Sequence, residues 1–329
     1  MAATGLKSYI LDNNLKSGLL LAGFPVLLVL IAFALELVLM GMGYLPSAGS
    51  LGGDLRSAAA MLAVSAPLAL LVAAVWFVVA YWSQGAIIAA ATGAKPVSRT
   101  DEPVLYNLLE NLAISRGLKT PSLYVVETRA LNAYASGVDP DRSAVTVTRG
   151  LVEALDRDEL EAVLGHELTH ILNRDTRLMV ICAVFAGIIT LVSEILWRAV
   201  RYSDFRSRRR ENRKGGGLLI VVALALVAVG YVLSVLLRFA LSRKREFLAD
   251  AGSVELTKDP DAMIRALQKI DGRSDLSAPE QVRPLFFDDR PRGFSALMST
   301  HPPIAARIEA LVKYAGGRVE ATTTAVPTT

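Results

Sequence analysis

The most informative stretch of this 329-residue chain is His166-Glu167-Leu168-Thr169-His170. On a helix that advances about 100° per residue, His170 lies about 40° around from His166 and one turn further along. Both imidazoles can therefore approach one tetrahedral ion from the same side. Glu167, about 100° around, can reach a water at that ion without being a ligand itself. Two neutral nitrogen ligands beside a general base predict a catalytic zinc site.

The residues around this stretch predict a helix next to a small sheet. Asp156, followed three residues later by Glu159, is an aspartate version of a capping box and marks the start of the helix that carries the histidines. Further upstream, Pro103 opens a leucine-rich helix. Short runs with alternating β-branched residues predict strands at Ser122–Glu127 and Ser143–Thr148.

A catalytic zinc ion usually has three protein ligands, so a third must come from elsewhere. His301 is the remaining histidine. The acids Glu246 and Asp250 lie one helical turn apart, directly after an apolar segment. If a helix continues there, Glu246 can face the zinc ion while Asp250 accepts a hydrogen bond from a ligand histidine. The alternative is that both acids are solvated and offset the positive charges of residues 243–245. The residues alone leave the choice open.

His301 precedes two prolines, which restrict the local backbone because each disfavours the α conformation before it. A loop that leads into a helix at 303–314 explains this pattern as well as an active-site role does.

The composition indicates a membrane protein with a soluble part: 53% of the residues are hydrophobic, 20% are charged, and the mean hydropathy is positive. The single cysteine, Cys182, excludes a disulfide framework and a thiolate metal cluster. It lies in an apolar run, where a buried inert thiol is expected.

Four apolar segments, at about 18–40, 58–82, 178–197 and 217–237, each reach the roughly 20 residues that a membrane-spanning helix needs. The first is too long for a signal-peptide core and is read as a retained anchor. The expected fold is a mainly α membrane protein with four apolar helices and a cytoplasmic α+β zincin-like domain with a small sheet. The expected parts are a membrane hairpin at 1–94, catalytic segments at 95–177 and 238–317, a second apolar hairpin at 178–237 with a basic loop at 198–216, and a disordered tail at 318–329.

Lysine and arginine flank the outer ends of the first hairpin and predict that both ends face the cytoplasm, in a multi-pass protein of the cell membrane. The second hairpin conflicts with this rule, because eight basic residues and two acids give 198–214 a net charge of +6. Either that loop is translocated, or the two helices enter the cytoplasmic leaflet without crossing it. Glu36 marks either a polar path or a membrane interface.

The basic loop is the only strongly charged segment, and without it the chain carries −2. It has few aromatic residues that could stack on bases, so nucleic acid is not an expected partner. Contact with anionic lipid head groups is the expected role.

Several dispersed motifs then give a resemblance that covers nearly the whole chain. They are Leu6-Lys7-Ser8-Tyr9-Ile10, Asn132-Ala133-Tyr134-Ala135-Ser136-Gly137, the histidine helix with Asn173-Arg174-Asp175 after it, Glu246–Asp250, and Ser299-Thr300-His301-Pro302-Pro303 with Arg307. In this order they resemble the HtpX-type family of membrane zinc metalloproteases, which is related more distantly to the CAAX-prenyl endoproteases. Tyr134 and Ser136 stand where the family usually has phenylalanine and threonine, and the basic loop is longer than the family norm.

The resemblance implies one Zn²⁺ per chain held by His166, His170 and Glu246, with Glu167 as the base. It implies that Asp250 contacts one of the metal ligands without binding the metal itself. It also implies that His301 and Arg307 lie near the site and support the oxyanion. It also makes Asn132–Gly137 the strand that binds substrate, to which an extended peptide could add by β-augmentation. The implied activity is that of a zinc metalloendopeptidase of the cell inner membrane that acts in protein quality control and stress response, on misfolded or damaged membrane proteins or unfolded polypeptides.

Three other functions compete with this one. A protease dedicated to one lipidated or secreted partner has the same residues. A membrane scaffold with a vestigial zinc stretch is disfavoured, because Glu167, Glu246, Asp250 and His301 are all present. A transporter is disfavoured because the apolar segments show no pair of broken helices.

Overall fold

The computed structural model describes residues 6–182, 243–279, 282–288 and 301–319, with a few isolated positions between 194 and 224. The chain divides into two compact units. The described parts of the first unit are 6–14, 84–180 and the ranges from 243 onward; the second contains 15–83. Nearly all of the predicted second hairpin lies outside the described residues, including its basic loop except for Arg198, and so does the tail from residue 320.

Helices α1 (Leu6–Gly41) and α2 (Leu51–Thr92) supply most of the described residues of the second unit. The Ser65 hydroxyl donates to Glu36 at 2.5 Å, so this acid of the first apolar segment is bonded to α2. Within the described ranges, Leu51–Val79 is the one stretch long and apolar enough to cross a membrane, and Pro25–Gly41 is a shorter apolar helix. Two of the four predicted apolar segments are thus described as helices.

The first unit contains a four-stranded mixed sheet in the order β1 (Lys95–Pro96), β2 (Ser122–Val126), β4 (Ala144–Thr148), β3 (Ala133–Ser136). β2 and β4 run parallel, whereas β1 and β3 are antiparallel to their neighbours. β3 therefore lies at one edge of the sheet. A 3₁₀ turn, η1 (Pro140–Arg142), joins β3 to β4, and both predicted strands are confirmed with slightly shorter bounds.

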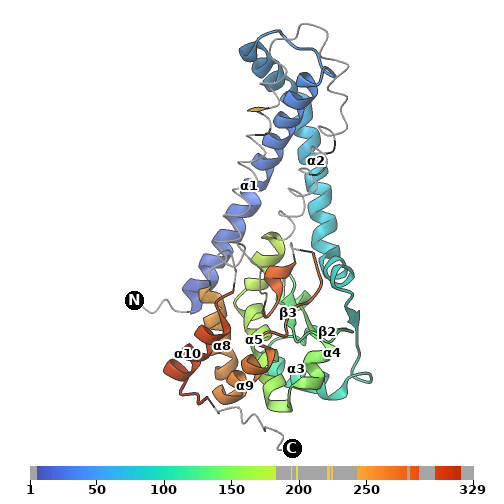
Figure 1. Ribbon diagram of the computed structural model, residues 1–329. Helices are drawn as coiled ribbons and strands as arrows, with labels where there is room; N and C mark the ends of the chain where they lie inside the picture. Colours follow the sequence, from blue (N-terminus) through green and yellow to red (C-terminus); the bar gives the residue numbers. More distant parts are fainter. Residues whose placement is uncertain are drawn as a thin grey trace, which may run out of the picture. The chain divides into compact units, whose positions relative to one another are not determined.

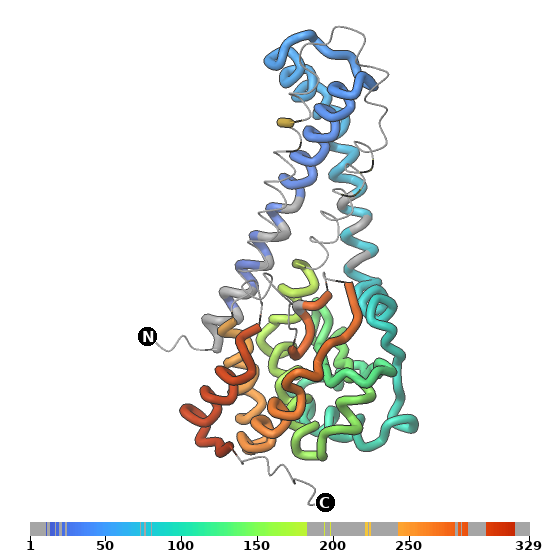
Figure 2. The backbone as a smooth tube through the Cα atoms, viewed as in Figure 1, coloured from blue at the N-terminus to red at the C-terminus, as the bar shows by residue number. Residues whose placement is uncertain are grey.

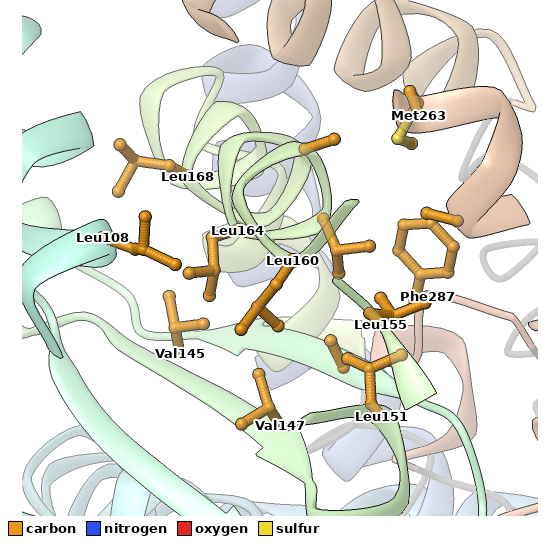
Figure 3. Packing of buried hydrophobic residues seen from close by; sticks show 14 of the residues in the cluster. Leu108, Val145, Val147, Leu151, Leu155, Leu160, Leu164, Leu168, Met263 and Phe287 are labelled. Atoms are coloured by element: carbon orange, nitrogen blue, oxygen red, sulfur yellow. The ribbon is translucent and has the colours of Figure 1, made fainter. Parts of the chain in front are cut away.

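Helices α3 (Pro103–Ser115) and α5 (Arg157–Leu172) pack against this sheet, and the short α4 (Arg149–Ala154) follows β4. Figure 3 shows Leu108 of α3 and Leu160 and Leu164 of α5 directed toward Val145 and Val147 of the sheet. Leu164, Val145 and Val147 have no exposed surface. The predicted capping box is present, since Asp156 and Glu159 bond to each other's backbone N–H groups at 2.9 Å.

Helices α8 (Lys244–Thr257), α9 (Pro260–Ile270) and α10 (Ile304–Ala315) pack together and cover α5 on the side away from α3 (Figures 1 and 2). α8 lies unusually close to α5. A Cβ atom added at Gly252 would lie 2.4 Å from Thr169 Cγ2. The Ser253 hydroxyl of α8 donates to the Ala162 carbonyl oxygen of α5 at 2.5 Å. Close contact between these two helices brings their polar residues into one site.

The structure confirms the predicted mixture of helices and a small sheet. It also confirms a helix that starts near 303 and contains Arg307, in the form of α10.

Candidate active site

α5 carries the three residues of the zinc stretch, and all three are buried: His166 exposes 0% of its surface, Glu167 1% and His170 5%. The alternative explanation of this motif, two histidines on the solvated surface of a helix, is excluded by this burial. The helix ends two residues after His170 at Leu172, and Arg174 adopts a left-handed conformation with φ of 59°. This break turns the chain so that Asp175 faces back toward the helix.

Each histidine contacts a carboxylate through Nδ1. His166 Nδ1 lies 2.9 Å from Asp250 Oδ1, and His170 Nδ1 lies 2.9 Å from Asp175 Oδ2. A carboxylate at this position accepts the Nδ1 proton and leaves Nε2 as the free lone pair. The two Nε2 atoms face each other at 3.0 Å. Two acceptor nitrogens at this distance cannot hydrogen-bond to each other, whereas a shared cation would satisfy both.

Glu246 of α8 completes the group from the other side. Its Oε2 lies 3.6 Å from His166 Nε2, and its Oε1 lies 3.9 Å from His170 Nε2. One ligand atom from each of the three residues lies within 4.8 Å of the others. Ligands about 2.0–2.2 Å from one zinc ion in a tetrahedral arrangement would be about 3.3–3.6 Å apart. The donor set and its spacing therefore fit zinc with one coordination position left open.

Charged groups around Glu246 favour its carboxylate form, which is the form that binds a metal. Arg245 Nε donates to Oε1 at 3.0 Å, and His301 Nδ1 lies 3.4 Å from Oε2. Burial opposes ionisation, but His301 and His166 outweigh it and hold the pKa of Glu246 well below the ordinary glutamate value. Oε2 itself accepts no hydrogen bond from the described residues.

Arg307 of α10 supports the site through Asp250. Its Nε and Nη2 donate to the two carboxylate oxygens at 2.9 and 2.6 Å, and its Nη1 donates to the Phe287 carbonyl oxygen at 3.1 Å. Burial would raise the pKa of Asp250, yet the paired guanidinium lowers it below the usual value. Arg307 thus fixes the carboxylate that orients His166.

Glu167 occupies a different environment from Glu246. Burial raises its pKa to about 7, although His170 and a backbone hydrogen bond from Ala135 act in the opposite direction. Its Oε1 is buried and has no hydrogen-bond partner among the described residues. A carboxyl group with a pKa near neutrality can both accept and return a proton.

The structure brings together the dispersed candidates His166, Glu167, His170, Glu246, Asp250, His301 and Arg307. Glu246 and Asp250 are buried, so the alternative of two solvated acids is wrong. Asp175 was part of a quoted motif but had no predicted role; its position five residues beyond His170 was the available signal. The contact of Phe287 with Arg307 had no signal in the sequence.

The stretch Asn132–Gly137 divides into two parts. Ala135 lies beside Glu167, and the role of this strand in substrate binding stays a prediction. The Asn132 side chain instead donates to the Ser274 and Asp288 carbonyl oxygens and accepts from the Ala133 and Phe287 N–H groups. Its hydrogen-bonding capacity is therefore used inside the protein.

Two buried histidines and a glutamate whose ligand atoms converge in this way could hold a metal ion, and comparison with known proteins identifies the class of protein. Residues 99–315 match the family model for Peptidase family M48. The chain is 38% identical over 323 residues to a protease HtpX homolog of Bacteroides fragilis. The match covers 95% of this chain and 100% of that protein. A protease HtpX homolog of Streptococcus gordonii is 34% identical over 293 residues, covering 87% of this chain and 95% of that protein.

This chain therefore belongs to peptidase family M48, as an HtpX-type membrane metalloprotease. The resemblance inferred from the dispersed motifs and the predicted enzyme class are both confirmed. Among solved structures, that of S. mikatae Ste24p matches with a TM-score of 0.45 and 17% identity, over 78% of this chain and 64% of that one.

Proposed function

We propose that this protein is a zinc-dependent endopeptidase whose single Zn²⁺ is held by His166, His170 and Glu246. The observation that carries the proposal is the pair of Nε2 atoms facing each other at 3.0 Å beside Glu246 Oε2, an oxygen that accepts no hydrogen bond from the described residues. A buried arrangement of this kind leaves polar atoms unsatisfied unless a cation joins them. M48 metalloproteases are zinc-dependent in general, which agrees with this donor set.

Zinc bound there would supply a polarised water and a Lewis acid for the peptide carbonyl. Glu167 takes the proton from the attacking water, since its Oε1 is free of other described partners and its pKa of about 7 suits proton transfer. The same carboxyl group then delivers that proton to the leaving amine.

His301 is the candidate for stabilising negative charge on the substrate carbonyl oxygen. Its Nδ1 lies 3.4 Å from Glu246 Oε2, which places the imidazole at the edge of the metal group. A donor aimed at the developing oxyanion contributes strongly in a buried site. Arg307 acts indirectly, because its guanidinium is bonded to Asp250 and Phe287.

The proposed substrates are misfolded or damaged membrane proteins, and unfolded polypeptides near the bilayer. The observation that supports them is the apolar helical stretch Leu51–Val79 in the same chain as the peptidase site. The proposal includes four membrane helices, a multi-pass topology and a catalytic unit that faces the cytoplasm, as the lysine and arginine distribution around the first hairpin predicts.

The test uses the full chain purified in detergent, with zinc content and cleavage of an unfolded membrane protein measured together. Glu167→Gln should keep zinc and lose cleavage, whereas Glu246→Ala should lose both. Glu255→Gln on the same helix as Glu246 is the matched control and should change neither, since Glu255 is exposed. Equal cleavage by wild type and Glu167→Gln would refute the mechanism, and normal zinc content in Glu246→Ala would refute the ligand set.

A further inference from the structure

Phe287 connects the hydrophobic core of the catalytic unit with the proposed zinc site. It lies in the described segment 282–288, after the short helix η3 (Arg283–Leu285), and exposes 1% of its surface. Its ring belongs to the hydrophobic cluster shown in Figure 3. The same ring also contacts two polar side chains of the zinc site, so its position affects the site as well as the core.

The two polar contacts of the Phe287 ring are with Arg307 and His166. The central carbon of the Arg307 guanidinium lies 4.4 Å from the ring centre, a distance at which a cation is attracted to an aromatic face. The centre of the His166 imidazole lies 4.7 Å from the ring centre, and the two rings are inclined by 62°. Edge contacts of this kind have a preferred geometry. The ring of Phe287 therefore restricts both side chains at once.

Hydrogen bonding alone does not fix the plane of the His166 imidazole. The carboxylate of Asp250 lies 2.9 Å from Nδ1 and fixes the position of that atom. One hydrogen bond tolerates a range of angles, and the terminal torsion of a histidine side chain has broad minima, so the imidazole can still rotate. The ring of His170 also contacts His166, but His170 is itself a proposed ligand. Phe287 therefore restricts the imidazole plane from outside the ligand set.

The backbone of Phe287 is bonded on both sides. Its N–H group donates to the Ala133 carbonyl oxygen at 2.8 Å and to Asn132 Oδ1 at 3.0 Å. Its carbonyl oxygen accepts from Arg307 Nη1 at 3.1 Å. Movement of Phe287 would leave these buried groups without partners, so the residue that packs against His166 is itself held in place.

Asn132 uses its whole side chain to hold this segment. Its Nδ2 donates to the Ser274 carbonyl oxygen at 2.7 Å and to the Asp288 carbonyl oxygen at 2.8 Å. Its Oδ1 accepts from the N–H groups of Ala133 and Phe287, each at 3.0 Å. Two donors and two acceptors are the full capacity of an amide, and Asn132 has no exposed surface. Because water does not compete for these bonds, Asn132 fixes the backbone on both sides of Phe287.

We infer that Phe287 and Asn132 are positioning residues of the proposed zinc site. Phe287 sets the plane of the His166 imidazole, and Asn132 holds the backbone that carries Phe287. Neither residue is a proposed ligand, and both act through His166. The inference rests on the proposed function and adds two residues to the site that supports it. For Asn132 this role differs from the substrate contact predicted from the sequence.

The expected consequence of losing this support is a zinc ion that is bound less tightly and in an altered geometry. A bond from zinc to nitrogen is strongest when the Nε2 lone pair points at the ion, so rotation of His166 weakens it. Loss of a group that supports a ligand typically lowers metal affinity about 10- to 100-fold. Leucine keeps most of the apolar contact of phenylalanine, so Phe287→Leu should lie near the lower end of this range.

The test compares Phe287→Leu with Phe286→Leu in the full chain purified in detergent. Phe286 is the matched control, because it is also buried but its ring contacts Tyr134, with the ring centres 5.6 Å apart. Both variants should lower the thermal midpoint of the metal-free protein, since each removes part of a buried ring. Zinc affinity, measured by competition with a chelator, should fall about tenfold in Phe287→Leu and stay at the wild-type value in Phe286→Leu.

Cobalt(II) provides a second measurement that a merely structural role would leave unchanged. It can replace zinc at a site of nitrogen and oxygen ligands, and its visible absorption depends on their geometry. The spectrum should change in Phe287→Leu and keep the wild-type form in Phe286→Leu. Cleavage of a quenched fluorescent peptide by zinc-saturated Phe287→Leu should show a lower kcat with KM within about twofold of wild type, because His166 acts on the bound zinc ion.

Asn132→Asp is a second variant that leaves Phe287 itself unchanged. The carboxylate has the shape of the amide and can still accept from the Phe287 N–H group, but it cannot donate to the Ser274 and Asp288 carbonyl oxygens. The loosened segment should lower zinc affinity and change the cobalt spectrum, as Phe287→Leu does. If Phe287→Leu fails to fold, Asn132→Asp decides the question with the same measurements.

Unchanged zinc affinity and an unchanged cobalt spectrum in folded Phe287→Leu would overturn the inference, and so would equal changes in Phe286→Leu. Either result leaves the proposed function intact. If the wild-type protein binds no zinc, or if Glu246→Ala binds it normally, the proposed ligand set is wrong and the inference fails with it.

Discussion

At the scale of single residues, the site depends on a different carboxylate behind each histidine. Asp175 comes from the helix break that follows His170, and Asp250 comes from α8, where Arg307 also binds it. Both carboxylates fix the Nδ1 proton and direct Nε2 toward the metal position. Because their surroundings differ, substitution of the two acids should have different consequences.

Asp175→Asn tests the simpler of these two contacts. The amide oxygen can still accept the Nδ1 proton, but the loss of charge makes His170 a weaker ligand. Zinc affinity should fall about 10- to 100-fold, while the folded protein keeps its thermal stability without metal. A competition titration with a chelator measures this. Asp158→Asn, at an exposed position in the first turn of the same helix, is the control; equal affinities of the two variants would contradict the assigned role.

Arg307→Met tests the buried ion pair. Asp250 would keep its charge in a buried position without the guanidinium, which typically costs about 3–5 kcal/mol of stability. The double variant with Asp250→Asn should recover much of this loss, because neither partner is then charged. Zinc affinity should stay low in both variants. Denaturant unfolding and metal titration separate the two effects, and an additive double variant would show that the pair is not coupled.

At the scale of elements, contact between α5 and α8 places the glutamate opposite the two histidines. Gly252 of α8 and Thr169 of α5 approach so closely that a Cβ atom at Gly252 would lie 2.4 Å from Thr169 Cγ2 and 2.6 Å from its Oγ1. The helix backbones must separate if a methyl group is added there. Glu246 lies on the same helix as Gly252 and would move with it.

Gly252→Ala should therefore reduce zinc binding without altering any ligand. A second change, Thr169→Ala, removes the two nearest atoms and should restore part of the binding. Metal content and thermal midpoint of the single and double variants measure this coupling. Gly85→Ala, at a helical position with nothing within 4 Å, is the control and should be neutral or stabilising by about 0.5–1 kcal/mol. Normal zinc binding by Gly252→Ala alone would show that α8 tolerates the shift.

At the scale of the whole molecule, the proposed zinc ion joins parts of the chain that are distant in sequence. Its ligands lie on α5 and α8, and the carboxylates behind them include one bonded to α10. A ligand that binds only the folded state stabilises it according to its concentration and affinity. The metal should therefore stabilise the packing of these three helices in addition to its catalytic role.

Removal of zinc with a chelator should lower the thermal midpoint of the purified protein. Zinc at about a thousandfold excess over its dissociation constant contributes about 4 kcal/mol, which corresponds to a shift on the order of 10 °C for a unit of this size. Glu167→Gln should show the same shift, because Glu167 is not a proposed ligand. Glu246→Ala should show little response to chelator. A wild-type midpoint that is insensitive to chelation would contradict the proposed structural contribution.

The sequence by itself determined the features that depend on local periodicity. The spacing of His166 and His170 fixes their angle on a helix, and the Asp156 capping box fixes where that helix begins. Alternating β-branched residues marked β2 and β4. Dispersed motifs in a constant order were sufficient to identify the family before any contact was known. These features require only neighbours within a few residues, so they can be read directly from the chain.

Only the tertiary structure decided which distant groups meet. Glu246 could have been solvated until α8 was seen packed against α5, and Asn132 could have been free for substrate until its four internal hydrogen bonds were seen. The hydrogen bond from the Phe287 N–H group to the Ala133 carbonyl oxygen likewise joins two residues that lie far apart in the sequence. Such contacts arise from the packing of whole elements, and residue spacing along the sequence carries little information about them.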